Sequence, residues 1–96
     1  MYARVSDLTG PTDRIDDGIA QYRDMVLPAV QHMDGFQRAY LLVDRELGRT
    51  LSITVWDSEA AMRASEDLVT PLRNQITETI SAKAEVSRYE VVVATA

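Results

Sequence analysis

Cysteine is absent from this 96-residue chain, and histidine, tryptophan and phenylalanine each occur only once. Without cysteine the chain has no disulfides, thiolate metal sites or cysteine nucleophiles. One histidine among scattered carboxylates does not give the ligand spacing of a metal site, so we expect no bound metal. The sequence also lacks a nucleophile elbow, a phosphate loop and a Rossmann turn. We therefore expect a protein that works without a metal, flavin or nucleotide cofactor.

Basic residues are few: ten Lys and Arg stand against fifteen Asp and Glu, which gives a formal net charge of -5. Nucleic acids and anionic membranes select basic patches, so neither is an expected partner. The first ten residues lack the apolar stretch of a signal peptide, and no apolar run approaches the length of a membrane span. The expected location is the cytoplasm.

Hydrophobic residues make up 46% of the chain and charged residues 26%, an ordinary globular composition. A chain of this length forms one domain, which we assign to residues 1–96, and buries roughly 60% of its unfolded surface. No linker or internal repeat interrupts it.

Two strands joined by a tight turn are predicted in the middle of the chain, over Phe36 to Asp44 and Leu51 to Trp56. Gly48 in the turn can adopt the positive φ that a short hairpin connection needs. The second strand alternates between an aliphatic face (Leu51, Ile53, Val55) and a face with hydroxyls (Ser52, Thr54, Trp56).

The first hairpin strand has no simply polar face. Alternation places Ala39, Leu41 and Val43 on one side, and Phe36, Arg38, Tyr40 and Leu42 on the other. A sheet of this kind needs cover on both sides. We expect helices on one side and a second subunit on the other.

The remaining elements surround this hairpin. A first strand is predicted at Tyr2 to Leu8, and a last strand at Glu85 to Val93. Between strands one and two, a long helix with Thr12 as N-cap runs toward Gly35, with a kink at Pro28. Its apolar stripe is Ile15, Ile19, Tyr22, Val26, Val30 and Met33.

After the hairpin, Ser58 is expected to cap a short helix, and a second helix is predicted from Asp67 to Ala82. Leu68, Leu72, Ile76 and Ile80 form its apolar row. The order β-α-β-β-α-β predicts an α+β, ferredoxin-like domain with a four-stranded antiparallel sheet. Both helical segments are expected on one face of that sheet, and Tyr22 and Tyr89 in the core.

The chain resembles the antibiotic biosynthesis monooxygenase-like family over essentially its whole length. The matching anchors are Leu27-Pro28 before Gly35-Phe36, the strand end Val55-Trp56, and Ser58-Glu59-Ala60. The resemblance implies a dimeric α+β barrel, in which the sheets of two subunits pack face to face. It also implies one of three behaviours: cofactor-independent oxygenation of phenols or quinols, heme degradation, or no activity.

Heme degradation is disfavoured by a residue-by-residue comparison with the heme-degrading members. Counting from Trp56, their catalytic tryptophan falls at Ser65 and their heme-ligating histidine at Gln75. Their asparagine near the end of strand one falls at about Asp7. None of these residue types is kept.

The expected function is a cofactor-independent, monooxygenase-like reaction on a small aromatic phenol or quinol. Candidate substrate-binding residues are Trp56, Tyr40, Arg38, Ser52, Thr54 and His32. Tyr2 and Arg4 lie on a comparable strand face, and no set of catalytic residues is recognisable. For each candidate a structural role is the alternative: packing for Trp56, helix capping or exposure for His32, and a filled core or interface for the others. The competing function is a non-enzymatic homodimeric barrel that binds a small molecule or only dimerises.

Overall fold

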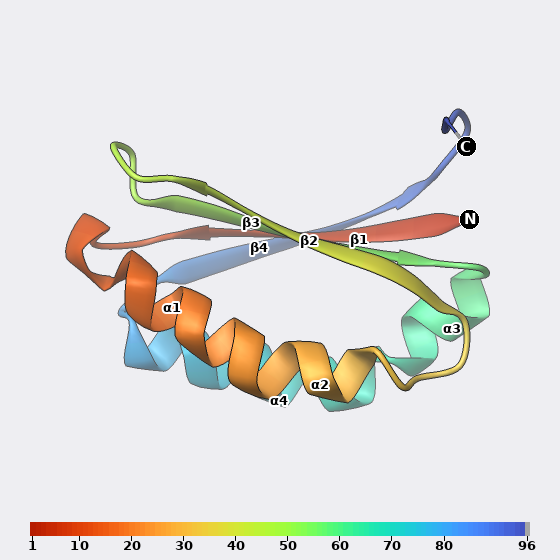
Figure 1. Cartoon of the computed structure of the whole chain (residues 1–96), viewed down its shortest axis with the longest axis horizontal. Helices are drawn as coiled ribbons and strands as arrows, with labels where there is room; N and C mark the ends of the chain where they lie inside the picture. The colour runs from red at the N-terminus through yellow and green to blue at the C-terminus, as the bar shows by residue number, and fades with distance from the viewer. Residues whose placement is uncertain (96) are drawn as a thin grey trace.

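The computed structural model describes residues 1–95 and shows a four-stranded antiparallel sheet with its helices on one face (Figure 1). The strands are β1 (Tyr2–Thr9), β2 (Phe36–Asp44), β3 (Arg49–Trp56) and β4 (Lys83–Glu90). Their order is β2-β3-β1-β4, which makes β1 and β3 the central strands. This arrangement confirms the predicted ferredoxin-like α+β fold.

The connection from β1 to β2 is a chain of short helical segments: η1 (Thr12–Arg14), α1 (Ile15–Gln21), η2 (Tyr22–Val26) and α2 (Leu27–Val30). The segment η2 is π-helical and directly precedes α2, which contains Pro28. Proline lacks an amide hydrogen and its ring crowds the carbonyl four residues earlier, so a wider turn here relieves the clash. The kink expected at Pro28 takes the form of a π-helical segment just before the proline.

The second connection contains α3 (Glu59–Ala64) and α4 (Glu66–Thr79). The side chain of Ser58 accepts a hydrogen bond from the Ala61 amide at 3.1 Å, which confirms it as the N-cap of α3. Thr12 was wrongly predicted as a cap, because the first helical segment starts there as a 3-10 turn without a side-chain cap. None of the helices within residues 1–95 is long and apolar enough to cross a membrane.

The hairpin between β2 and β3 closes against the end of β1. Gly48 has φ +68°, and its carbonyl accepts a hydrogen bond from the Gly10 amide at 3.0 Å. A Cβ atom at Gly48 would lie 2.2 Å from the Gly10 carbonyl oxygen, so both the backbone angle and the space require glycine. The predicted turn is confirmed.

A β-bulge in β2 corrects the predicted face of Phe36. Phe36 lies opposite Trp56 and Arg38 lies opposite Val55, so Gln37 is an extra residue that reverses the alternation. Phe36 therefore points toward the helices, where its ring meets the Trp56 ring edge-on with centroids 5.5 Å apart. The expectation that it shares a face with Tyr40 and Leu42 is wrong.

Three further core assignments are wrong. Tyr89 lies on the edge strand β4 and is 57% exposed. In α4, Leu68 is exposed and Val69 is buried in its place, whereas Leu72, Ile76 and Ile80 of the predicted apolar row do lie in or against the core. Strand β4 ends at Glu90, and the valines expected to continue it, at 92 and 93, are exposed.

The hydrophobic core lies between the sheet and the helices. Its members come from every layer: Leu8, Tyr22, Val26, Val30, Trp56, Met62, Val69, Ile76 and Ile80. Val30 and Trp56 have no exposed surface at all. Among these apolar side chains, however, four buried residues are polar: Arg4, Ser6, Thr54 and Ser65.

Candidate functional site

The face of the sheet that the helices cover is the polar one. In the central strands, Arg4 pairs with Thr54 and Ser6 pairs with Ser52, and all four side chains lie on the helix side. The alternating residues Val5, Ile53 and Val55 lie on the opposite face, which no element of residues 1–95 covers (Figure 1). We call the two sides the covered face and the open face.

A cavity of about 50 Å³ lies between the covered face and the helices. Its polar lining consists of Arg4, Ser6, Tyr22, Thr50, Ser52, Thr54 and Arg73. Its apolar lining consists of Leu8, Val26, Val30, Leu41, Val69, Ile76 and Ile80. A water needs roughly 10–15 Å³ of such volume, so the cavity has room for a few waters. Apolar walls with a few convergent polar groups are typical of small-molecule sites.

Arg4 is the most deeply buried charged residue of the site, with 2% of its surface exposed. Its Nη1 donates to Ser65 Oγ at 2.8 Å and to the Met62 carbonyl at 3.1 Å. Ser65 Oγ itself donates to the same carbonyl at 2.6 Å, so the C-terminal end of α3 fixes the guanidinium. The other terminal nitrogen, Nη2, is buried and has no hydrogen-bond partner among the described residues.

The charge of Arg4 is only partly compensated. Burial, with a smaller effect of the nearby Arg73 charge, lowers the pKa of Arg4 to about 10, so it stays protonated at neutral pH. Glu66 lies 4.0 Å away, but its carboxylate is hydrogen-bonded to Arg88, which lowers the pKa of Glu66. The interior thus holds a positive charge whose nearest counter-ion is engaged elsewhere.

Arg73 and Tyr22 bring two more polar groups to the same cavity. Within residues 1–95, Arg73 Nη2 and the Tyr22 hydroxyl are buried without a hydrogen-bond partner. Burial lowers the pKa of Arg73. Burial also raises the pKa of the Tyr22 phenol, and the neighbouring Ser52 hydroxyl opposes that rise without forming a well-aligned hydrogen bond. The Tyr22 phenol therefore stays neutral, and its hydroxyl can donate a hydrogen bond to an acceptor.

Trp56 contacts two residues that line the cavity. Its indole Nε1 donates to Thr54 Oγ1 at 3.0 Å, and the Arg4 guanidinium carbon lies 5.7 Å from the ring centroid. That distance is within the range of a cation–π contact. The indole does not line the cavity; it holds Arg4 and Thr54, which do.

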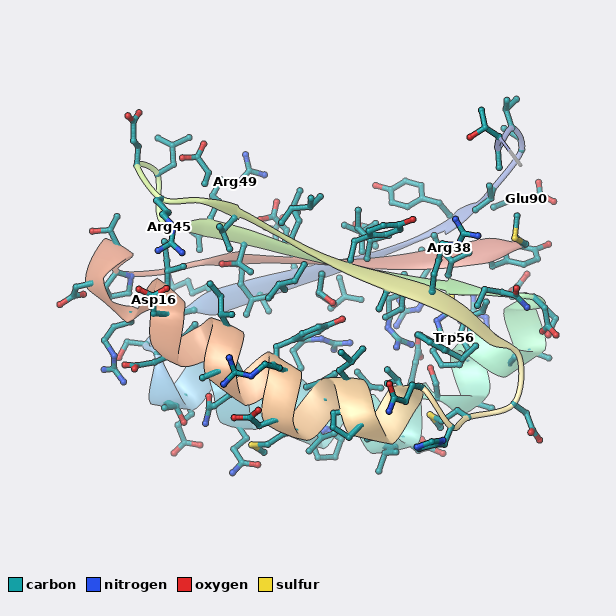
Figure 2. The ribbon with its side chains drawn as sticks, in the orientation of Figure 1. Asp16, Arg38, Arg45, Arg49, Trp56 and Glu90 are labelled. Atoms are coloured by element: carbon teal, nitrogen blue, oxygen red, sulfur yellow. The ribbon has the colours of Figure 1, made fainter. Side chains whose placement is uncertain are left out.

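The six predicted substrate-binding residues fall in three places. Ser52 and Thr54 line the cavity, and Trp56 packs directly behind it. Arg38 and Tyr40 lie on the open face, where Arg38 Nη1 is 3.4 Å from the Tyr40 hydroxyl oxygen. Figure 2 shows Arg38 and Trp56 on opposite sides of the sheet. His32 is exposed just beyond the end of α2 and does not line the cavity.

Two cavity residues are absent from the predicted substrate-binding set. The sequence placed Tyr22 in the core, and for Arg73 it allowed a cleft mouth but favoured a solvated helix face. For Arg73 a signal exists: it stands four residues after Val69 and three before Ile76, on the buried row of α4. For Tyr22 there is none, because an apolar stripe does not reveal that one member's hydroxyl meets a cavity.

Comparisons with known proteins support this architecture. Residues 1–69 match the family model described as antibiotic biosynthesis monooxygenase. Two uncharacterized proteins of Mycobacterium tuberculosis are 40% and 36% identical to the chain over 91 residues, 95% of its length. The chain spans about two fifths of the length of these curated relatives, 41% and 39%.

Two solved structures illustrate the shared fold. The heme-degrader MhuD of Mycobacterium tuberculosis, with two hemes bound in its active site, is 18% identical with a TM-score of 0.78, covering 100% of both chains. SnoaB, a cofactor-independent oxygenase from Streptomyces nogalater, is 18% identical with a TM-score of 0.66, covering 97% of this chain and 94% of its own. Both show a likeness of fold. Because the family model matches more than two thirds of the chain, this chain belongs to the antibiotic biosynthesis monooxygenase family.

Proposed function

We propose that the protein is a cofactor-independent, monooxygenase-like enzyme that acts on a small aromatic phenol or quinol in the covered-face cavity. One observation carries the proposal: a buried cavity in which Arg4, Arg73 and Tyr22 offer donors that the described residues leave unpaired. Folded proteins rarely leave a buried hydrogen-bond donor unpaired, because each unpaired donor lowers the free energy of unfolding by about 1–3 kcal/mol. Such groups are therefore expected where a ligand supplies the acceptors.

The reaction proposed for the site needs no group beyond the substrate and dioxygen. Loss of the phenolic proton makes the ring carbon electron-rich enough to pass electrons to dioxygen. One oxygen atom then becomes a carbonyl oxygen at that ring carbon, which gives a quinone, and the other leaves as water with the ring hydrogen and the phenolic hydrogen. The guanidinium groups of Arg4 and Arg73 would stabilise the negative charge that develops on the substrate oxygen.

A second part of the proposal is a homodimer formed through the open face. Its aliphatic side chains are Val5, Leu42, Leu51, Ile53 and Val55, with Tyr40 beside them. Tyr40 and Leu42 are each 48% exposed. An exposed apolar surface of this kind marks an interaction site, and in a twofold dimer a second copy would present the same apolar surface.

Oxygen uptake by the purified protein with a panel of phenols and quinols tests the oxygenase proposal. We expect uptake with at least one of them, and a tenfold or greater loss of rate in Arg73→Met. The non-enzymatic alternative, a dimeric small-molecule binder, predicts ligand binding without uptake by any member of the panel. That result would replace the oxygenase proposal.

Heme degradation remains disfavoured despite the likeness of fold to MhuD. His32, the only histidine, is exposed and lies outside the cavity lining. A cavity of about 50 Å³ is also far too small for a porphyrin, since drug-sized ligands occupy roughly 300–1,000 Å³. Titration with hemin should give only weak, non-saturating absorbance; a saturable Soret band that is lost in His32→Ala would contradict this expectation.

A further inference from the structure

We propose that the covered-face cavity binds its ligand as an organic oxyanion, with the charged oxygen held between the guanidinium groups of Arg4 and Arg73 and the hydroxyl of Tyr22. The inference deepens the proposed function, because it names the charge state and size of the ligand of the same cavity. It rests on that function for the assignment of the cavity as the ligand site.

The convergence of unpaired donors is the first argument. Arg4 comes from β1, Tyr22 from η2 and Arg73 from α4, so three separate elements contribute to one cavity. Across the described residues, only five buried side-chain polar atoms lack a partner, and three of them belong to these residues. An oxyanion accepts hydrogen bonds in several directions without donating any, which matches three donors better than a neutral hydroxyl does.

Charge balance is the second argument. Arg4 and Arg73 repel each other in a desolvated space, and each has a lowered pKa chiefly because of burial. The carboxylate nearest to Arg4 belongs to Glu66, which lies outside the cavity lining and is bonded to Arg88. A ligand with one negative charge would offset this unbalanced charge, because opposite charges attract strongly at low dielectric.

The cavity lining contains no residue suited to act as a general base. Within the described chain it has two guanidiniums, one phenol, serine and threonine hydroxyls, and aliphatic walls, but no carboxylate or imidazole. A phenolic ligand would therefore lose its proton to solvent and be held as the phenolate by electrostatic stabilisation. The reaction would then need no proton-abstracting residue.

Size and wall chemistry define the ligand class further. About 50 Å³ bounded by Val26, Val30, Val69 and Ile76 holds only a few waters, so even a single ring with few substituents requires these side chains to move apart. The ligand class is therefore a single-ring phenolate or aromatic carboxylate.

The test uses 4-nitrophenol as probe, because its phenolate absorbs visible light and its phenol form does not. At a pH one unit below the pKa of the free probe, added wild-type protein should increase the phenolate absorbance in a saturable way. Sodium benzoate should compete with the probe, whereas benzyl alcohol, its neutral counterpart, should not. The buried Trp56, next to Arg4, gives a second readout through its fluorescence.

Variants assign the effect to the site. Arg73→Met should weaken probe binding at least tenfold and abolish the absorbance increase, and Arg73→Lys should restore part of it by returning the charge. Tyr22→Phe should weaken binding by a few fold. Arg23→Met is the matched control, because Arg23 lies on the exposed side of η2 with Asp24 as its partner.

Three results would overturn the inference: no saturable increase with the wild-type protein, equal competition by benzyl alcohol, or an Arg73→Met variant that binds like Arg23→Met. If Arg73→Met does not fold, Arg73→Lys and Tyr22→Phe carry the same comparison. Phenolate binding without oxygen uptake would leave this inference standing and remove the oxygenase proposal. Oxygen uptake at an unchanged rate in Arg73→Met, with probe binding also unchanged, would overturn the inference and move the oxygenase reaction away from this cavity.

Discussion

The two faces of the sheet differ in the opposite sense to that of an ordinary two-layer domain. The covered face, sealed by helices, holds Arg4, Ser6, Ser52 and Thr54, while the open face has aliphatic side chains around Ile53. A sheet that only had to pack against helices would bury its aliphatic side and expose its hydroxyls. This difference supports the proposal of a polar ligand on the covered face and an apolar partner on the open face.

Each face of the sheet lowers the stability of an isolated chain. On the covered face, Arg4 gives up hydration with 2% of its surface exposed and one nitrogen unpaired. On the open face, Tyr40 and Leu42 keep about half of their surface in water. Under the proposed function, ligand binding would offset the first cost and a second subunit would offset the other.

The largest effect is expected from a charge on the open face. Ile53 lies opposite Val5 on one side and Tyr40 on the other, in the middle of this face. Ile53→Asp should abolish the dimer, because burying an unpaired carboxylate at an apolar interface is prohibitive. Light scattering coupled to size exclusion should then show the mass falling from two chains to one.

Leu68→Asp is the control for that change, since Leu68 is an exposed apolar residue on α4, outside the sheet. It should leave the mass at two chains. A wild-type protein that is already monomeric would contradict the second-copy proposal, and another domain or protein would then be the partner of the open face.

Next in size is Arg4→Met, which should raise stability by about 1–3 kcal/mol while abolishing phenolate binding. Desolvation dominates the environment of Arg4, and its removal leaves no orphaned carboxylate because Glu66 keeps Arg88. Thermal unfolding would report this as a rise of roughly 4–8 °C per kcal/mol. A lower melting temperature would mean that the bonds to α3 outweigh the burial cost, against the account of a functional charge.

The sign of the pH dependence follows from the same burial. The folded pKa of Arg4, about 10, lies below the ordinary value of an arginine, so the unfolded chain holds this proton more firmly. Arg4 thus lowers stability at neutral pH, and this penalty shrinks as the pH rises above about 10. The stability gap between Arg4→Met and wild type should therefore narrow above that pH, as measured by urea unfolding at several pH values.

A smaller effect is expected from Thr54→Val on the covered face. The variant keeps the shape but removes the acceptor of the Trp56 indole, whose 3.0 Å bond is buried. Leaving that donor unpaired should cost about 1–3 kcal/mol of unfolding free energy. Thr50→Val is the matched control, because Thr50 lines the same cavity but is not part of this bond. Equal losses of unfolding free energy in Thr54→Val and Thr50→Val would show that the hydrogen bond of the Trp56 indole does not account for the effect.

The smallest effect is expected at the cap of α3, the helix whose C-terminal end fixes Arg4. Ser58→Ala should cost about 1 kcal/mol, because the Ala61 amide loses its acceptor. Ser87→Ala, on the exposed edge strand β4, should change stability by less than about 0.5 kcal/mol. Denaturant unfolding of both variants measures the difference, and a Ser58→Ala as neutral as Ser87→Ala would show that the cap does not hold α3.

The sequence alone was enough to predict the hairpin, the element order and the resemblance, because these rest on local signals such as the alternation in β3 and the glycine at position 48. The face of Phe36 was not predictable in the same way. One bulged residue, Gln37, reverses the alternation, and a bulge leaves no reliable trace in a single sequence.

The site was predictable only in part for a related reason. Ser52 and Thr54 were found because strand alternation separates two faces, although it does not tell which face the helices cover. Arg73 was placed in solvent because the apolar row of α4 was drawn through the exposed Leu68. Helix rotation is decided by packing against the sheet, and the burial of Val69 in place of Leu68 was enough to hide that Arg73 lines the cavity.

The most direct test of the account is a crystal structure of the protein grown with 4-nitrophenol, since it examines both faces at once. We expect the phenolate oxygen within hydrogen-bonding distance of Arg4 Nη2 and Arg73 Nη2, and a second copy packed on the aliphatic open face. A cavity filled only by ordered water, with the probe lying on an uncovered open face, would contradict the assignment of ligand and partner to the two sides.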